Sequence, residues 1–171
     1  MTCKSLCLWS VLSFFLACAG ERPPSQPVFG ATVRTAPVHF SYELADGKGA
    51  LSSEAMRGKP TVIVFLTTYD LASQAQARFL SGISQRHTGI NAAGIILERS
   101  ENRPLIVAFR DALRLSYPVA MADASLISGE GPFGDVHTVP STVVLDSENR
   151  LVWKHVGLAR EEEIEDALRH L

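Results

Sequence analysis

Apolar side chains occupy every second position from Val38 to Leu44, with polar or small residues between them. This period of two is typical of a half-buried β-strand, because successive side chains of a strand point to opposite faces. Residues 46–49 read Asp-Gly-Lys-Gly and predict a turn. Residues 51–56 then predict a single helical turn, capped by Ser52 or Ser53.

Two longer runs, residues 61–66 and 90–97, are apolar at nearly every position. Such runs are typical of central strands that are covered on both faces. A shorter strand is predicted at 118–121. Residues 141–145 and 151–156 are apolar and β-branched on either side of a polar turn, which predicts a β-hairpin.

Three helices are predicted, at residues 70–87, from about 102 to 115, and at 159–171. Pro104 takes the favoured first-turn position of the second helix, and the third helix begins with three glutamates, which suit the helix dipole. The side chains expected on the buried faces recur at spacings of three and four. They are Ala75, Phe79, Leu80 and Ile83 in the first helix and Leu105, Ile106, Phe109, Leu113 and Leu115 in the second.

A strand–helix–strand crossover followed by a hairpin and a closing helix predicts an α/β domain. Its mixed central sheet would carry helices on both faces, with an N-terminal strand extension. We place this domain at residues 38–171, after a proline-rich tether at 20–37 whose composition cannot form a core.

Residues 1–19 predict an export signal, with Lys4 before an apolar run too short for a membrane span. Two processing routes stay open. Ala17-Cys18-Ala19 fits signal cleavage after Ala19, whereas residues 15–18 resemble a bacterial lipoprotein box, in which Cys18 would carry the lipid. Phe15 departs from the leucine usual in that box. Either route predicts an exported protein of the cell envelope or periplasm, and the second also predicts a membrane anchor.

The 171 residues are 46% hydrophobic and carry a formal net charge of −2, and no basic run predicts a nucleic-acid interface. All three cysteines, Cys3, Cys7 and Cys18, precede residue 19. The predicted domain therefore has no thiolate nucleophile and no internal disulfide. His137 and the other histidines lack metal-ligand spacing, so neither a metal nor a cofactor is predicted.

Three segments together resemble the thioredoxin-like superfamily, in particular the exported TlpA/ResA-type thiol-disulfide oxidoreductases and their peroxiredoxin-like relatives. Arg-Gly-Lys-Pro at 57–60 resembles the family's entry into its first core strand. Val139-Pro140 resembles the cis-proline loop. Residues 65–74 align without gaps with the family's Phe-Trp-Ala-Thr-Trp-Cys-Pro-Pro-Cys-Arg segment. The resemblance covers residues 40–171 and implies a thioredoxin-like three-layer fold.

The third segment also departs from the family. Tyr69 replaces a tryptophan, while Asp70 and Ser73 stand where the family has its nucleophilic and resolving cysteines. Aspartate cannot attack a disulfide and serine cannot resolve one, because that exchange needs thiolates. Asp70 is a good helix N-cap. The alternatives are that Asp70 and Ser73 bind a ligand, or that the Val139-Pro140 loop binds a peptide.

The resulting expectation is a thioredoxin-like binding or scaffold module without redox cysteines, which binds a protein or peptide partner at the cis-proline face. The alternative is the activity that the resemblance implies, thiol-disulfide exchange or a peroxiredoxin-like antioxidant function, with an external thiol. Whether the protein is an enzyme therefore stays open at this point.

Overall fold

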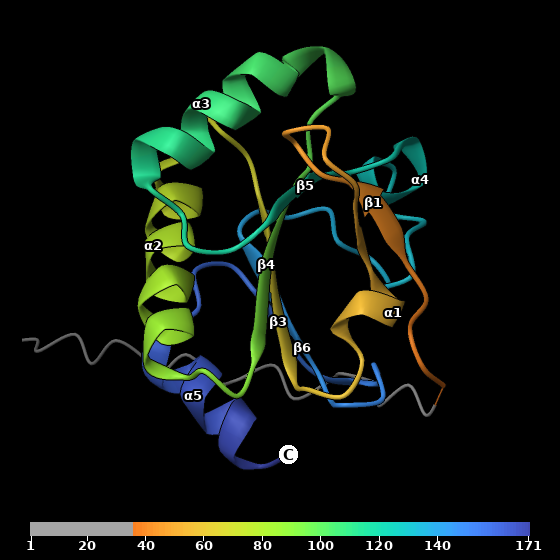
Figure 1. The fold of residues 1–171 in the computed structure, drawn as a ribbon, viewed down its shortest axis with the longest axis vertical. Coiled ribbons are helices and arrows are strands. Elements are labelled where there is room, and N and C mark those ends of the chain that lie inside the picture. Colours follow the sequence, from red (N-terminus) through yellow and green to blue (C-terminus); the bar gives the residue numbers. More distant parts are fainter. Residues whose placement is uncertain (1–35) are drawn as a thin grey trace, which may run out of the picture.

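Residues 36–171 are described in a computed structural model of the chain (Figure 1). The predicted signal peptide, Cys18 and nearly all of the predicted tether lie outside the described residues. Among the described helices, none is both long enough and apolar enough to cross a lipid bilayer.

The centre of the domain is a mixed five-stranded sheet with the strand order β5-β4-β3-β6-β7. Strands β3, β4 and β5 are parallel, and β6 is antiparallel to both β3 and β7. The bounds are β3 Thr61–Leu66, β4 Asn91–Ile96, β5 Val119–Met121, β6 Ser141–Leu145 and β7 Leu151–Val156. Because β7 runs in the same direction as β3, four of the five strands end at one edge of the sheet, here called the carboxyl edge.

Two layers cover this sheet, as Figure 1 shows. On one face lie the long helices α2 (Leu71–Arg86), α3 (Arg103–Leu113) and α5 (Glu161–Arg169), and the short helix η1 (Ser100–Asn102) precedes α3. On the other lie the hairpin of β1 (Ser41–Glu43) and β2 (Ala50–Ser52) and the single turns α1 (Ser53–Met56) and α4 (Ala124–Ile127). The predicted three-layer arrangement with an N-terminal strand extension is confirmed.

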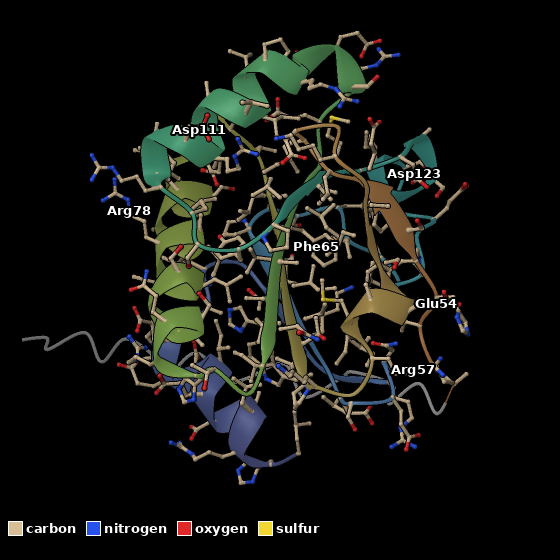
Figure 2. The ribbon with its side chains drawn as sticks, in the orientation of Figure 1. Glu54, Arg57, Phe65, Arg78, Asp111 and Asp123 are labelled. Carbon is tan, nitrogen blue, oxygen red and sulfur yellow. The ribbon has the colours of Figure 1, made fainter. Side chains whose placement is uncertain are left out.

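Strand β3 divides the core because every one of its residues is buried. Val62, Val64 and Leu66 pack toward the long helices. Ile63 and Phe65 pack toward the hairpin, and Phe65 lies in the middle of the domain (Figure 2). The ring centroids of Phe65 and Phe133 are 5.2 Å apart. Burial on both faces explains why this strand reads as a continuous apolar run.

Three short elements are not predicted by the sequence, and one of them is η1, just before α3. Strand β2 covers only three residues, and α4 is a single turn within a segment that the glycines mark as a loop. The predicted helical turn after β2 is confirmed as α1, with the Ser52 hydroxyl accepting a hydrogen bond from the Ala55 N–H at 3.3 Å.

The predicted buried faces of the helices are partly wrong. Leu80 and Ile83 are buried, but Ala75 and Phe79 are only partly buried, and polar Ser73 and Gln76 are buried instead. These polar side chains have hydrogen-bond partners in the fold, which a pattern of apolar residues does not reveal.

In α3, Ile106 and Phe109 are buried as predicted, while Leu105 is 58% exposed and Leu113 is partly buried. Leu105 lies about 100° from Ile106 around the helix axis and turns away from the sheet. The prediction of a buried Leu105 is therefore wrong.

Candidate functional site

The connection from β3 to α2 lies at the carboxyl edge, where the sequence places Tyr69, Asp70 and Ser73. Strand β6 begins at the same edge, because Ser141 pairs with Phe65. Pro140 therefore lies beside the end of β3. The topology brings the Asp70–Ser73 turn and the Val139-Pro140 loop to one edge of the sheet.

Asp70 is the N-cap of α2, as predicted. One of its carboxylate oxygens accepts a hydrogen bond from the Ser73 N–H at 2.8 Å and the other from the Ala72 N–H at 3.3 Å. Hydrogen bonds from the backbone N–H and the hydroxyl of Ser73 lower the pKa of Asp70 below its usual value. The carboxylate is thus ionised at neutral pH and engaged by the helix that follows it.

Ser73 is buried one turn into α2. Its Oγ accepts a hydrogen bond from the Thr67 N–H at 3.2 Å, while its hydroxyl also interacts with Asp70. Ser73 therefore joins the end of β3 to the start of the helix. The contacts of Asp70 and Ser73 support a structural role for both residues.

Glu98 is a buried carboxylate behind this turn that sequence reasoning missed. One of its oxygens accepts a hydrogen bond from the Thr68 N–H at 2.5 Å, and the other accepts from the Asn102 amide at 2.9 Å. Glu98 follows β4 and holds the turn that follows β3. A single glutamate in a loop carries no sequence signal for such a role.

Tyr69 and Leu71, on either side of Asp70, project into solvent with 78% and 79% of their surfaces exposed. A hydrophobic residue just before an N-cap commonly packs on the fourth helical residue. Here that fourth residue is Gln74, which offers no apolar surface. Tyr69 therefore stays exposed, and the absence of an apolar residue at position 74 is a sequence signal that could have revealed this.

The Val139–Pro140 peptide bond is cis, the isomer that the sequence leads us to expect. Phe133 and Val136, both buried, anchor the preceding loop in the core. The Pro140 carbonyl accepts a hydrogen bond from the Gly157 N–H at 2.8 Å. Within residues 36–171, neither the N–H nor the C=O of Val139 takes part in a hydrogen bond, so both can meet a ligand backbone.

Gln76 fixes the segment that follows β7. Its side-chain oxygen accepts a hydrogen bond from the Ala159 N–H at 2.8 Å in a buried position. This bond holds residues 157–159 between α2 and the cis-proline loop. Leu158 on this segment is 42% exposed, and Val156, the last residue of β7, is 55% exposed.

Most of the exposed large hydrophobic side chains follow the carboxyl ends of the strands along the chain. Six of the seven in residues 36–171 belong to segments that adjoin the carboxyl ends of β3, β4, β5 and β7, and the seventh is Leu171. We call these six the carboxyl-edge surface: Tyr69, Leu71, Leu105, Ile127, Val156 and Leu158. Clustered exposed apolar residues mark interaction sites, whereas scattered ones carry no such meaning.

Few side chains among the described residues could bind a metal or transfer a proton. No cluster of three or more potential metal ligands occurs within the described part of the chain. His137 Nε2 lies 2.8 Å from Asp135 Oδ1, and both side chains are mainly exposed. No hydrogen bond joins this pair to Asp70 or Ser73, so the described residues do not assemble a catalytic triad at the turn.

The sequence matches no protein-family model and none of the curated proteins with which it was compared. Solved structures do match. A thioredoxin-family thiol:disulfide interchange protein from Chlorobium tepidum TLS has 20% identity and a TM-score of 0.66, with 78% of this chain and 93% of that chain covered.

A secreted Mycobacterium tuberculosis disulfide oxidoreductase homologous to E. coli DsbE has 16% identity and a TM-score of 0.64, with coverage of 77% and 96%. A DsbF homologue from Corynebacterium diphtheriae has 17% identity and a TM-score of 0.67, with coverage of 80% and 87%. The chain therefore has a thioredoxin-like fold.

Proposed function

We propose that this protein is an exported thioredoxin-like module that binds a protein or peptide partner and does not catalyse thiol-disulfide exchange. The observation that carries the proposal is the carboxyl-edge surface, in which Tyr69 and Leu71 flank a helix start that bears Asp70 and Ser73 in place of thiols. Apolar side chains favour binding, while the chemistry of disulfide exchange has no thiolate to start from.

The partner would be an extended segment with apolar side chains. Val139 offers a free N–H and C=O beside Pro140, which suits pairing with an extended backbone. Tyr69 and Leu71 on one side and Leu158 on the other offer apolar contacts to its side chains. Aromatic anchors such as Tyr69 commonly carry much of the energy of a protein interface.

Export is supported by the apolar run near the start of the chain and, from the comparisons, by the description of one structural neighbour as secreted. We further propose that Cys18 carries a lipid, so that the domain is tethered to a membrane through residues 20–37. The mass of the mature N-terminus tests this, because lipidation would leave Cys18 as the first residue and add the mass of the acyl chains.

Partner capture from a cell-envelope extract tests the binding function. The chain is compared with a Tyr69→Ala/Leu71→Ser variant and with Leu171→Ser, a matched change of an exposed leucine outside the surface. We expect a captured protein that is lost with the double variant and kept with Leu171→Ser. Equal capture by all three would contradict the proposed surface.

The thioredoxin-like fold of the oxidoreductase neighbours favours a second candidate, thiol-disulfide chemistry with a thiol supplied from outside. Reduction of insulin by the purified chain, above the rate in buffer with dithiothreitol, would favour this candidate over the first.

A further inference from the structure

A groove of about 340 Å³ runs between α2 and α3. Gln74 lines it on the α2 side, and buried Phe109 lies at its base. The exposed part of α3 supplies Leu105, Ala108 and Ala112 as its rim. Thr68, just before the Asp70–Ser73 turn, also lines the groove, whereas no residue of the cis-proline loop does.

Helix α3 thus has two apolar stripes. Ile106 and Phe109 pack on the sheet, while Leu105, Ala108 and Ala112 recur at spacings of three and four on an exposed stripe. A helix that packs on only one side has no need of the second stripe. Leu105 projects from it, and the two alanines leave room beside it.

We propose that this groove binds the same groove of a second copy of the chain, with the two α3 helices antiparallel about a two-fold axis. Leu105 and Ala112 are seven residues apart, which is about 10.5 Å along a helix. A two-fold axis near Ala108 places Leu105 of each copy over Ala112 of the other. The stripe is therefore complementary to itself, as a symmetric dimer interface requires.

The charges at the two ends of α3 fit the same arrangement. Glu101 lies in η1 just before the helix, and Arg114 is its C-cap. Both side chains are exposed, and neither forms an ion pair within residues 36–171. In the antiparallel pair, Glu101 of one copy lies about 3 Å along the helix axis from the level of Arg114 of the other, at both ends of the interface. Arg103, which is level with Arg114, is already paired with Glu43 at 2.8 Å. This complementarity favours a second copy over an unrelated helix.

The interface is short, because α3 has 11 residues. It lies near the low end of the size range for specific interfaces, so the dimer is weak and reversible. Thr68, the neighbour of Tyr69, lines the groove, and Leu105 belongs both to the groove and to the carboxyl-edge surface. The other partner-binding residues, Tyr69, Leu71, Val139 and Leu158, lie outside the groove. Dimer formation therefore leaves most of the proposed partner site open.

Sedimentation velocity of the full chain, from about 1 μM to about 1 mM, spans the range in which weak complexes dissociate. We expect a concentration-dependent monomer–dimer equilibrium. Leu105→Asp and Ala108→Arg each place a charge in the interface and should weaken it at least tenfold. Leu171→Asp, an exposed leucine outside the groove, should leave it unchanged. Far-UV circular dichroism verifies that each variant is folded.

Charge reversal tests the symmetry itself. Glu101→Arg and Arg114→Glu should each weaken self-association, because each sets like charges against one another at both ends. An equimolar mixture of these two variants should dimerise again, since both contacts then join opposite charges. The variant with both reversals in one chain should also recover.

A chain that stays monomeric at every concentration would overturn the proposal. So would self-association that Leu105→Asp and Ala108→Arg leave intact, because a different surface would then form the dimer. Failure of the charge-reversed mixture to recover would overturn the antiparallel arrangement. Leu105 belongs to both surfaces, but partner capture is tested at Tyr69 and Leu71, which lie outside the groove, so the two proposals can fail separately.

Discussion

Replacing Asp70 tests the role of the residue that stands where the resemblance places a nucleophilic cysteine. In Asp70→Ala, the N–H groups of Ala72 and Ser73 lose their acceptor at the helix start. Loss of an N-cap costs about 1 kcal/mol, and loss of a negative charge at a helix N-terminus adds about 0.3–1 kcal/mol. Asp70→Asn keeps a hydrogen-bond acceptor and loses only the charge, so its free energy of unfolding should fall only by the charge contribution of about 0.3–1 kcal/mol.

Urea unfolding of the chain measures this loss. With an m-value of about 1–3 kcal/mol/M, a loss of about 1.5 kcal/mol lowers the midpoint by roughly 0.5–1.5 M. The cap lies at the surface, so m itself should not change. A midpoint for Asp70→Ala within about 0.2 M of the parent would refute the capping account, because the helix start would then depend on other contacts.

The contribution of Asp70 to the stability of the chain should depend on pH. The pKa of Asp70 is lower in the folded chain than in the unfolded chain. Its contribution is therefore present above the unfolded pKa of about 3.9 and is lost as the pH falls through the folded value. The difference in stability between the parent and Asp70→Asn should shrink below about pH 4. A difference in stability that stays constant down to pH 2 would show that it does not come from ionisation of the Asp70 carboxylate.

Three further substitutions test contacts that hold the fold together. Gly94→Ala should cost about 1–2 kcal/mol in urea unfolding, because its Cβ would lie 3.2 Å from the ring of Tyr117, and a neutral result would mean that the ring can move. Glu98→Ala should cost about 2 kcal/mol and speed amide exchange at Thr68, which loses a charged acceptor, whereas unchanged exchange would contradict that bond. Asn149→Ala should cost about 2–3 kcal/mol, because it removes a buried hydrogen bond of 2.7 Å at a residue with φ of 63°, and Asn149→Gly should cost less if backbone conformation contributes.

The sheet could be predicted closely because burial on both faces makes β3 and β6 stand out as apolar runs, while the polar turn after β6 marks the start of β7, a partly buried edge strand. Their bounds in the structure are those expected from the sequence. Strand β2 and helix α4 were not predicted, because three- and four-residue elements are determined by packing and not by a repeating pattern.

The role of a site residue could be predicted only where its partners are its neighbours in the sequence. The capping role of Asp70 follows from its residue type and its place before an apolar helix. Glu98 and Gln76 act through residues distant in sequence, Thr68 and Ala159, so their roles appear only in the fold. The exposure of Leu105 likewise depends on how α3 lies on the sheet.

The central claim is that this helix start has the architecture of a redox site but lacks its chemistry. Insulin reduction with dithiothreitol, measured side by side for the parent chain and for Asp70→Cys/Ser73→Cys, tests it directly. We predict no turnover above buffer for the parent and measurable turnover for the double variant, which restores a thiol pair at the start of α2. Turnover by the parent chain would contradict the claim.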